Sequence, residues 1–358
     1  MAMAVAIKTI VRRVMASAIN SAINLDANET NVWLIKLFAA ALLDVDYFSK
    51  DYSVMSQICI AVVVSMLVAL ANLHAANAPN SDAKAGVKDS HFNAKQVFDY
   101  KQPIIFQDDF RSGLGKWKLA IDAVEDRALL DKQAGEKRVS VVKAPDSEEG
   151  RMALRCVVPR ALGNFRSEIA LPHEKGFHER WYGARIYVPE DWIFSPDDGG
   201  DIVLQWHGIL GDERKTRGFP PLSIAIKNDQ WAIHRAFGPT DDIKRDAKFL
   251  EEPVQKGKWA AWVVHVRWSS GTNGLVQIWK DGKQVWEVNG PNTYLSEPVV
   301  PYFKTGLYHP EWKKGNEEKF KQAETAVTER VIYTAEVKIG DERAKYEDVA
   351  PALAKSQN

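Results

Sequence analysis

Residues 302–308, Tyr-Phe-Lys-Thr-Gly-Leu-Tyr, alternate polar or aromatic residues with apolar ones. Side chains of a β-strand point to its two faces in turn, so this pattern predicts a strand with Tyr302, Lys304 and Tyr308 on one face. Gly306 lies between them and is expected to keep that face open. The opposite face would pack into a core. The segment therefore indicates a sheet with one buried face and one face available for chemistry.

Two further segments repeat this arrangement. In residues 164–168, Asn-Phe-Arg-Ser-Glu, a period of two places Arg166 and Glu168 on one face. In residues 204–207, Leu-Gln-Trp-His, the same period pairs Gln205 with His207. Apolar residues flank both pairs and are expected to face the core. Together the three segments supply the acidic, basic and hydrogen-bonding groups that catalysis requires.

The rest of the chain predicts an all-β jelly roll, with two antiparallel sheets and a concave groove. After residue 104, short β-rich segments alternate with Gly, Pro, Asp and Asn, and few helical stretches separate them. Asp281-Gly282 predicts a two-residue hairpin turn. We expect one such domain over 103–346 and a tail over 347–358. The predicted strands are 139–143, 151–158, 165–171, 180–188, 201–208, 222–227, 230–236, 259–268, 274–280, 283–288, 302–308 and 330–339.

Two long connections interrupt this pattern, at 238–258 and 309–328. The first mixes acidic and basic residues around Phe249-Leu250, and we expect it to hold a helical turn. Compact domains seldom carry long loops without a use, so both connections are candidate walls of the groove. Solvated surface loops are the alternative.

The N-terminal part predicts export. Residues 58–71 form an almost uninterrupted apolar run of fourteen residues, and small residues typical of a cleavage site follow at 75–78. The run is shorter than the roughly 20 residues of a membrane-spanning helix. We therefore predict a signal peptide at 55–78, a linker at 79–102 and a secreted or periplasmic protein, with a membrane anchor as the alternative. Residues 1–54 are a genuine extension, or the true start is Met55.

Charge and cysteine content exclude several classes of function. The chain has 47 basic and 47 acidic residues, and five of each precede residue 79, which leaves 42 of each. No basic stripe suggests nucleic acid, no glycine loop suits a phosphate, and no His or Cys spacing suits zinc. Cys59 lies in the apolar run, so a cleaved protein keeps only Cys156, a predicted core residue, and forms no internal disulfide.

Further motifs accompany the three segments in a fixed order. They are Trp-Tyr-Gly at 181–183, Val-Pro-Glu-Asp-Trp at 188–192, Gly-Lys-Trp at 257–259, Ile-Trp-Lys-Asp-Gly at 278–282 and Arg-Val-Ile-Tyr at 330–333. Over about residues 104–342 the set resembles the jelly-roll polysaccharide lyases, the family of glucuronan lyases and heparin lyase I-like enzymes. It is also similar to the active-site signature of alginate lyases. The resemblance implies a concanavalin A-like sandwich and β-elimination at a uronic acid.

In such an elimination, C5 loses a proton and the C4 oxygen departs, so the reaction needs a carboxylate-binding group, a base and an acid. The resemblance assigns Gln205 and Arg166 to the carboxylate, which Arg can bind bidentately. His207 titrates near neutrality and is a natural base. Tyr308 would protonate the leaving oxygen, or act as both base and acid if Lys304 and Arg166 lower its pKa. The choice between His207 and Tyr308 as base depends on syn or anti elimination and stays open.

Three neighbours are predicted to support these groups. Lys304 would add positive charge near the substrate, and Tyr302 would form a wall on which a sugar stacks. Glu168 is expected to orient Arg166, and a purely structural ion pair is the alternative.

Three more residues are predicted to bind substrate. His234 lies in a strand where only one of two neighbouring polar residues can face the groove. Arg214 and Arg217 lie in the loop that directly follows the His207 strand, where they would bind uronates. A solvated, mixed-charge loop is the alternative for the two arginines.

No cofactor is expected to be required. Lyases of this kind often hold a structural calcium near the chain ends, but Ala335 stands where an acidic ligand is expected, which leaves Asp108 and Asp109 as oxygen ligands. The expected partner is an anionic polysaccharide, glucuronan first and alginate second, with no nucleic acid and no stable membrane partner. We expect a monomer. The alternatives are a glycoside hydrolase, which needs paired carboxylates, and a non-catalytic sugar-binding protein.

Overall fold

The computed structural model describes residues 94–126, 138–145, 150–174, 176, 178–194, 200–208, 219–239, 241–295, 301–322 and 326–352. The predicted extension at 1–54, the signal peptide at 55–78 and most of the linker lie outside these residues. Within the described residues, no helix combines the length and the apolar character needed to cross a membrane.

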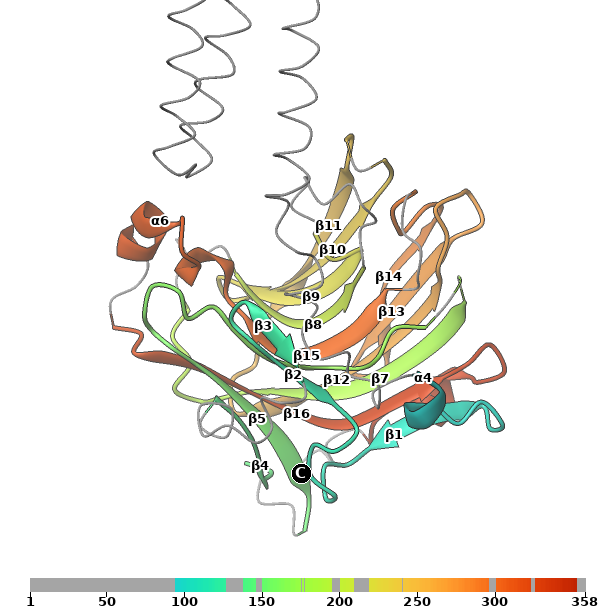
Figure 1. Ribbon diagram of the computed structural model, residues 1–358, viewed down its shortest axis with the longest axis horizontal. Helices are drawn as coiled ribbons and strands as arrows, with labels where there is room; N and C mark the ends of the chain where they lie inside the picture. Colours follow the sequence, from blue (N-terminus) through green and yellow to red (C-terminus); the bar gives the residue numbers. More distant parts are fainter. Residues whose placement is uncertain are drawn as a thin grey trace, which may run out of the picture. The chain divides into compact units, whose positions relative to one another are not determined.

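Two antiparallel sheets pack face to face, which confirms the predicted jelly roll (Figure 1). The inner sheet has the order β11 (Lys244–Pro253), β10 (Gln230–Phe237), β9 (Leu222–Lys227), β8 (Asp201–His207), β15 (Tyr302–Tyr308), β6 (Arg166–Ala170), β2 (Lys118–Ile121) and β3 (Val124–Asp126). The outer sheet has the order β14 (Lys283–Asn289), β13 (Leu275–Lys280), β12 (Lys258–Arg267), β7 (Glu179–Val188), β16 (Glu329–Gly340), β5 (Met152–Pro159) and β4 (Val139–Lys143), and β1 (Ile104–Asp108) pairs with β16.

The core lies between the sheets and follows from the period of two in each strand. In β15, Phe303 and Leu307 are buried against the outer sheet. Trp206 of β8 and Tyr182 of β7 surround Phe303, with ring centroids 5.6 and 5.7 Å from its ring. Burying one such side chain contributes about 1.5–3 kcal/mol, so this alternation fixes which face of the inner sheet remains free. Thr305 links the sheets through a 2.7 Å hydrogen bond to Thr334 of β16.

The predicted hairpin is present between β13 and β14. Asp281 and Gly282 form its turn, and both have positive φ, 50° and 84°. A tight turn with positive φ at both central positions matches the right-handed twist of the two strands, which is why this dipeptide suits the position.

The expectation of a helical turn in the connection 238–258 is wrong, because this connection contains strand β11. β11 pairs only with β10 and is the edge strand of the inner sheet. Most of its residues are exposed, so it lacks the alternation of apolar residues by which strands are recognised. The connection 309–328 contains the 3-10 turn η3 (Pro310–Trp312) and the helix α6 (Glu317–Gln322).

The packed part extends beyond the predicted boundaries at 103 and 346. The helix α4 (Ala94–Val97) and the buried ring of Phe98 precede β1, and Phe98 contacts Phe106 at a centroid distance of 6.0 Å. At the other end, α7 (Tyr346–Val349) places a fully buried Val349 on the outer sheet. Val349 fits there because Gly183 has no side chain. A β-carbon at Gly183 would lie 1.9 Å from the Val349 carbonyl oxygen.

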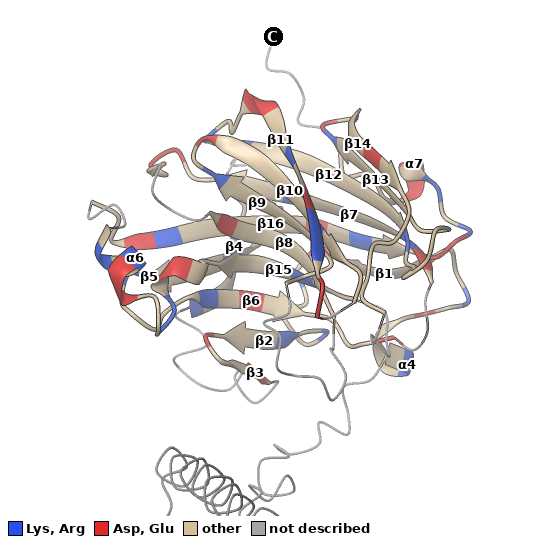
Figure 2. Ribbon diagram, turned by 90° about the horizontal axis from the view of Figure 1, so that it is seen from above, with Lys and Arg blue, Asp and Glu red and all other residues tan. Residues whose placement is uncertain are grey.

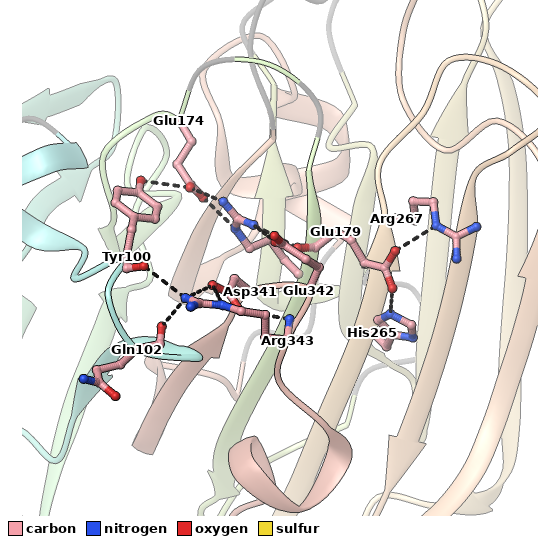
Figure 3. Close-up of polar contacts among 10 residues, drawn as sticks. Tyr100, Gln102, Glu174, Glu179, His265, Arg267, Asp341, Glu342 and Arg343 are labelled. Carbon is pink, nitrogen blue, oxygen red and sulfur yellow. Dashed lines mark hydrogen bonds and ion pairs between the residues drawn. The ribbon is translucent and has the colours of Figure 1, made fainter.

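A polar network joins these two end segments (Figure 3). Arg343 donates hydrogen bonds of 3.0 Å to the backbone carbonyls of Tyr100 and Gln102. An ion pair of 2.5 Å with Asp341 orients its guanidinium. Tyr100 donates a 3.0 Å hydrogen bond to Glu174, just before β7. The segment ahead of β1 is thus held by residues that follow β16.

Candidate active site

The predicted catalytic side chains come from three adjacent strands at the centre of the inner sheet, β6, β15 and β8 (Figure 2). Each side chain lies on the face opposite the core, because the residues between them are buried. The antiparallel register then places them in rows across the strands. The register pairs are Tyr308 with Arg166, Lys304 with Gln205 and Tyr302 with His207.

Glu168 anchors the centre of the site. Its side chain is fully buried; one oxygen accepts a hydrogen bond from the Gln205 amide, and the other forms a 3.0 Å ion pair with Lys304. The prediction that Glu168 orients Arg166 is therefore wrong. Glu168 and Arg166 are two residues apart in β6, and the side chain of Glu168 contacts Lys304 of β15 and Gln205 of β8 instead of Arg166. Lys304 is 1% exposed, which makes it a structural cation beneath the site.

Glu125 of β3 is a site residue that sequence reasoning missed. Its carboxylate accepts a 3.1 Å hydrogen bond from the Tyr302 hydroxyl and forms an ion pair with Lys304 at 3.2 Å. Arg166 lies 3.9 Å from the same oxygen. Burial by itself would raise the pKa of Glu125, but the Lys304 and Arg166 charges lower it to about 2. Glu125 is therefore ionised at neutral pH.

The sheet register explains how Glu125 reaches the site. Ala120 of β2 is opposite Glu125 on one side and opposite Glu168 on the other. The small side chain of Ala120 leaves room for the carboxylate above it. A three-residue strand with one acidic residue gives no recognisable sequence pattern. The nearest sequence signal is Asp122, because aspartate is a common turn residue. It forms the turn between β2 and β3, where its φ is +48°.

His207 has the geometry of a base. Its Nδ1 is 2.8 Å from the Gly208 carbonyl oxygen, which can only accept, so Nδ1 carries the hydrogen. In the neutral ring Nε2 then has a free lone pair. Burial and the Lys304 charge lower the pKa of His207 below its ordinary value, so the ring is neutral at pH 7.

The hydroxyl group of Tyr308 is protonated at neutral pH, as a general acid requires. Its ring is half-buried and packs edge-on against Phe165 at 5.7 Å. Burial and the negative charge of Glu168 raise the pKa of Tyr308, and the opposing effect of Arg166 is smaller. The condition for Tyr308 to act as both base and acid, a lowered pKa, is therefore not met here.

Tyr302 forms one wall of the site together with His173, a second residue that sequence reasoning missed. The rings of Tyr302 and His173 are 4.0 Å apart between centroids, and His207 lies 6.0 Å from Tyr302 on another side. Burial lowers the pKa of His173 to about 4 despite the nearby carboxylate of Glu125. Burial and Glu125 raise the pKa of Tyr302. Both side chains are therefore neutral at pH 7.

The remaining predicted binding residues do not lie at this centre. His234 of β10 is on the same face, but two strands away from β8, because Gln205 pairs with Ser223 and Ser223 pairs with His234. Arg214 and Arg217 belong to residues 209–218, outside the described part of the chain.

Gly306 is required for a reason other than an open face. Its φ is +135°, and a β-carbon there would lie 2.4 Å from the Ser167 carbonyl oxygen and 3.0 Å from Cys156 Sγ. The backbones of β15 and β6 thus approach closely above the core. Cys156 is buried, as predicted.

Both residues considered for a calcium ion have partners within the protein. The two oxygens of Asp108 accept hydrogen bonds from the Phe110 amide, at 2.8 Å, and from Trp117 Nε1, at 2.7 Å. Asp109 forms an ion pair with Arg111. The described residues contain no group of three or more His, Cys, Asp or Glu side chains arranged to hold a metal ion.

Known protein structures are similar to this fold. An endo-β-1,4-glucuronan lyase from Trichoderma reesei is 22% identical, with a TM-score of 0.53 over 70% of this chain and 100% of that one. An alginate lyase from Aplysia kurodai is 12% identical, with a TM-score of 0.40 over 58% of this chain and 88% of that one. The search of curated proteins finds no match. The model of the polysaccharide lyase family matches residues 116–338, more than half of the sequence. The chain therefore belongs to the polysaccharide lyase family.

Proposed function

We propose that this lyase cleaves a uronic-acid polymer by β-elimination, with glucuronan as the first candidate substrate and alginate as the second. The observation that carries the proposal is the convergence of Arg166, Gln205, His207 and Tyr308 on one face of three adjacent strands. Their protonation states match the reaction, because the imidazole is neutral and the phenol is protonated.

In this proposal Gln205 and Arg166 bind the uronate carboxylate and stabilise the charge that develops when C5 is deprotonated. His207 Nε2 takes the C5 proton. The electron pair of the C5–H bond forms the C4–C5 double bond as the C4–oxygen bond breaks. Tyr308 donates its proton to the departing oxygen, and proton exchange with water restores both side chains. The products are an unsaturated uronate end and a new free hydroxyl.

Charge balance at the centre favours a single carboxylate as the ligand. Arg166 and Lys304 contribute two positive charges, and Glu125 and Glu168 contribute two negative charges. The net charge of this cluster is zero, so it offers directed hydrogen bonds rather than a strong positive field. Such a site suits one uronate and gives little attraction for a densely sulfated chain.

The same two acids argue against glycoside hydrolysis. A hydrolase needs two carboxyl groups beside the scissile bond, one of them with a raised pKa. Glu168 is fully buried, and the pKa of Glu125 is lowered to about 2. Neither group can serve as a proton donor to a glycosidic oxygen.

The ranking of substrates rests on the similarity to the Trichoderma glucuronan lyase. We further propose export from the cytoplasm, because the apolar run at 58–71 resembles a signal peptide. N-terminal sequencing of the exported protein tests this, and a start near residue 79 is expected.

The deciding experiment follows the ultraviolet absorbance of the unsaturated uronate with glucuronan, alginate and heparin in parallel. We expect absorbance to rise with glucuronan, and Tyr308→Phe to abolish the rise. The value of kcat/KM should increase as the pH rises through the pKa of His207, which lies below 6.5, and stay high through neutrality. New reducing ends without absorbance would mean hydrolysis, and would overturn the proposal.

A further inference from the structure

The inner sheet continues past the catalytic centre through β9 and β10 to the edge strand β11 (Figure 2). Residues that are opposite one another in neighbouring strands lie on the same face of the sheet. The face that carries the candidate catalytic residues can therefore be traced from strand to strand. The pairs are Gln205 with Ser223, Ser223 with His234, and His234 with Ala247. β11 lies three strand spacings from β8, about 14 Å.

Two exposed side chains of β11 share this face. Arg245 is opposite Ala236 and Phe249 is opposite Ala232, and both alanines alternate with the core residues of β10. Phe249 is 41% exposed although it belongs to a strand, and its ring lies 6.2 Å from that of His234. An exposed aromatic ring beside an imidazole is a surface on which the C–H face of a sugar can stack.

Two cations on this part of the face, Arg245 and Lys227, have no ion-pair partner among the described residues. The guanidinium of Arg245 lies 4.3 Å from the centre of the Phe219 ring, and this contact orients it. Within the described residues, neither Arg245 nor Lys227 forms an ion pair, and both lie close enough to His234 to lower its pKa, after the larger effect of burial. At the catalytic centre, in contrast, Lys304 and Arg166 are both neutralised by glutamates.

We propose that Lys227, His234, Arg245 and Phe249 form a second binding surface for uronate units of the same polymer, distant from the scissile bond. The proposal rests on the proposed function for the nature of the ligand. Lys227, opposite Gln230, and Arg245, opposite Ala236, are too far apart along the sheet to share one carboxylate, so they bind the carboxylates of different units. His234 hydrogen-bonds a sugar between them, and Phe249 stacks against a sugar ring. The free positive charge lies here, so this site supplies the attraction for the polyanion that the neutral centre lacks. Long chains span both sites, and short ones reach only the centre.

The test uses the full chain with glucuronan and with its shortest cleavable oligomer. Arg245→Gln and Phe249→Ala are expected to raise KM for the polymer about tenfold each, with kcat unchanged and the oligomer unaffected. Lys248→Gln is the matched control, because Lys248 is exposed on the same strand but is opposite Ile233, on the other face. It is expected to behave like the wild-type protein.

Calorimetric binding of long glucuronan chains to the Tyr308→Phe protein separates this inference from the proposed function. If the wild-type protein eliminates uronate but Arg245→Gln and Phe249→Ala match Lys248→Gln in KM and in affinity, the second site is wrong. If no elimination occurs, but binding is present and Arg245→Gln weakens it, the second site stands and the lyase mechanism is wrong. Equal losses for polymer and oligomer would also overturn the second site, because the oligomer does not reach it.

Discussion

The charge of Glu125 decides how Arg166, Lys304 and Tyr302 are arranged before substrate arrives. Its carboxylate contacts all three groups, within 3.1–3.9 Å. Lys304 is buried and cannot turn to solvent, and its ammonium group pairs with both Glu125 and Glu168. The positions of these side chains of the candidate site therefore depend on an acidic residue from the edge of the sheet.

Replacing Glu125 by Gln is expected to destabilise the protein by about 2 kcal/mol at pH 7. Lowering the pKa of Glu125 from 4.5 to about 2 corresponds to a contribution of about 3 kcal/mol to the free energy of unfolding. Solvent screens part of this contribution, because the side chain is 20% exposed. Because the pKa is lowered in the folded state, the stabilisation is present above pH 4.5 and is lost as the pH falls toward 2. Urea unfolding at a series of pH values measures it.

The control for this measurement is Glu252→Gln, at an exposed position in β11. It should leave the unfolding free energy unchanged at every pH. A constant difference between Glu125→Gln and the wild-type protein down to pH 2 would show that the ion pairs of Glu125 do not produce the effect.

At the scale of elements, β15 combines a catalytic face with an irregular backbone. Its register with β8 shifts between Thr305 and Tyr308, while its pairing with β6 stays regular through Gly306. At Gly306 the backbone of β15 lies close to Ser167 of β6, and only a residue without a β-carbon fits there. The regular pairing with β6 places Tyr308, the proposed proton donor, beside Arg166.

Gly306→Ala is expected to destabilise the protein by about 3 kcal/mol, since the new methyl group would strike backbone atoms and Cys156 Sγ. Gly290→Ala is the matched control: φ is +104° there, but no atom lies within 4 Å of the added β-carbon. The control should cost about 1 kcal/mol, from backbone strain alone. Chemical denaturation of the two variants gives the comparison, and equal losses would mean that close approach of the strands is not the cause.

At the scale of the molecule, residues far apart in the sequence complete the structure. β1 pairs with β16, so the first described strand depends on the last. The network around Arg343 extends this contact to residues 94–102 (Figure 3). Neither end segment can bury its apolar residues alone, because each packs on strands formed by the other parts of the chain.

Arg343→Gln is expected to release the segment ahead of β1 while the two sheets remain intact. Amide hydrogen exchange in residues 94–102 should become several-fold faster, because the carbonyls of Tyr100 and Gln102 lose their donor. Exchange in β8 and β15 should not change. Arg267→Gln is the control, since Arg267 is an exposed arginine that pairs with Glu179 on the outer sheet. If both variants give the same exchange pattern, Arg343 does not hold the segment.

Much of the site could be predicted because antiparallel strands repeat with a period of two. Gln205 with His207, and Lys304 with its flanking tyrosines, lie on one face for this reason alone. Glu125, His173 and the strand β11 were not recognisable. Each is short, exposed or isolated in sequence, and each reaches its place through pairing with a distant segment.

The sequence by itself determined the fold class, most strands of the core though not β1 and β2, and the face on which each candidate catalytic side chain lies, because burial of alternate apolar residues is a local pattern with a large free energy. Only the tertiary structure decided which carboxylates neutralise Lys304 and Arg166, and which cations of β9 and β11 have no ion-pair partner among the described residues. Those outcomes depend on which strands become neighbours and on their register, and electrostatic interactions a few ångströms long act between residues that the sequence places far apart.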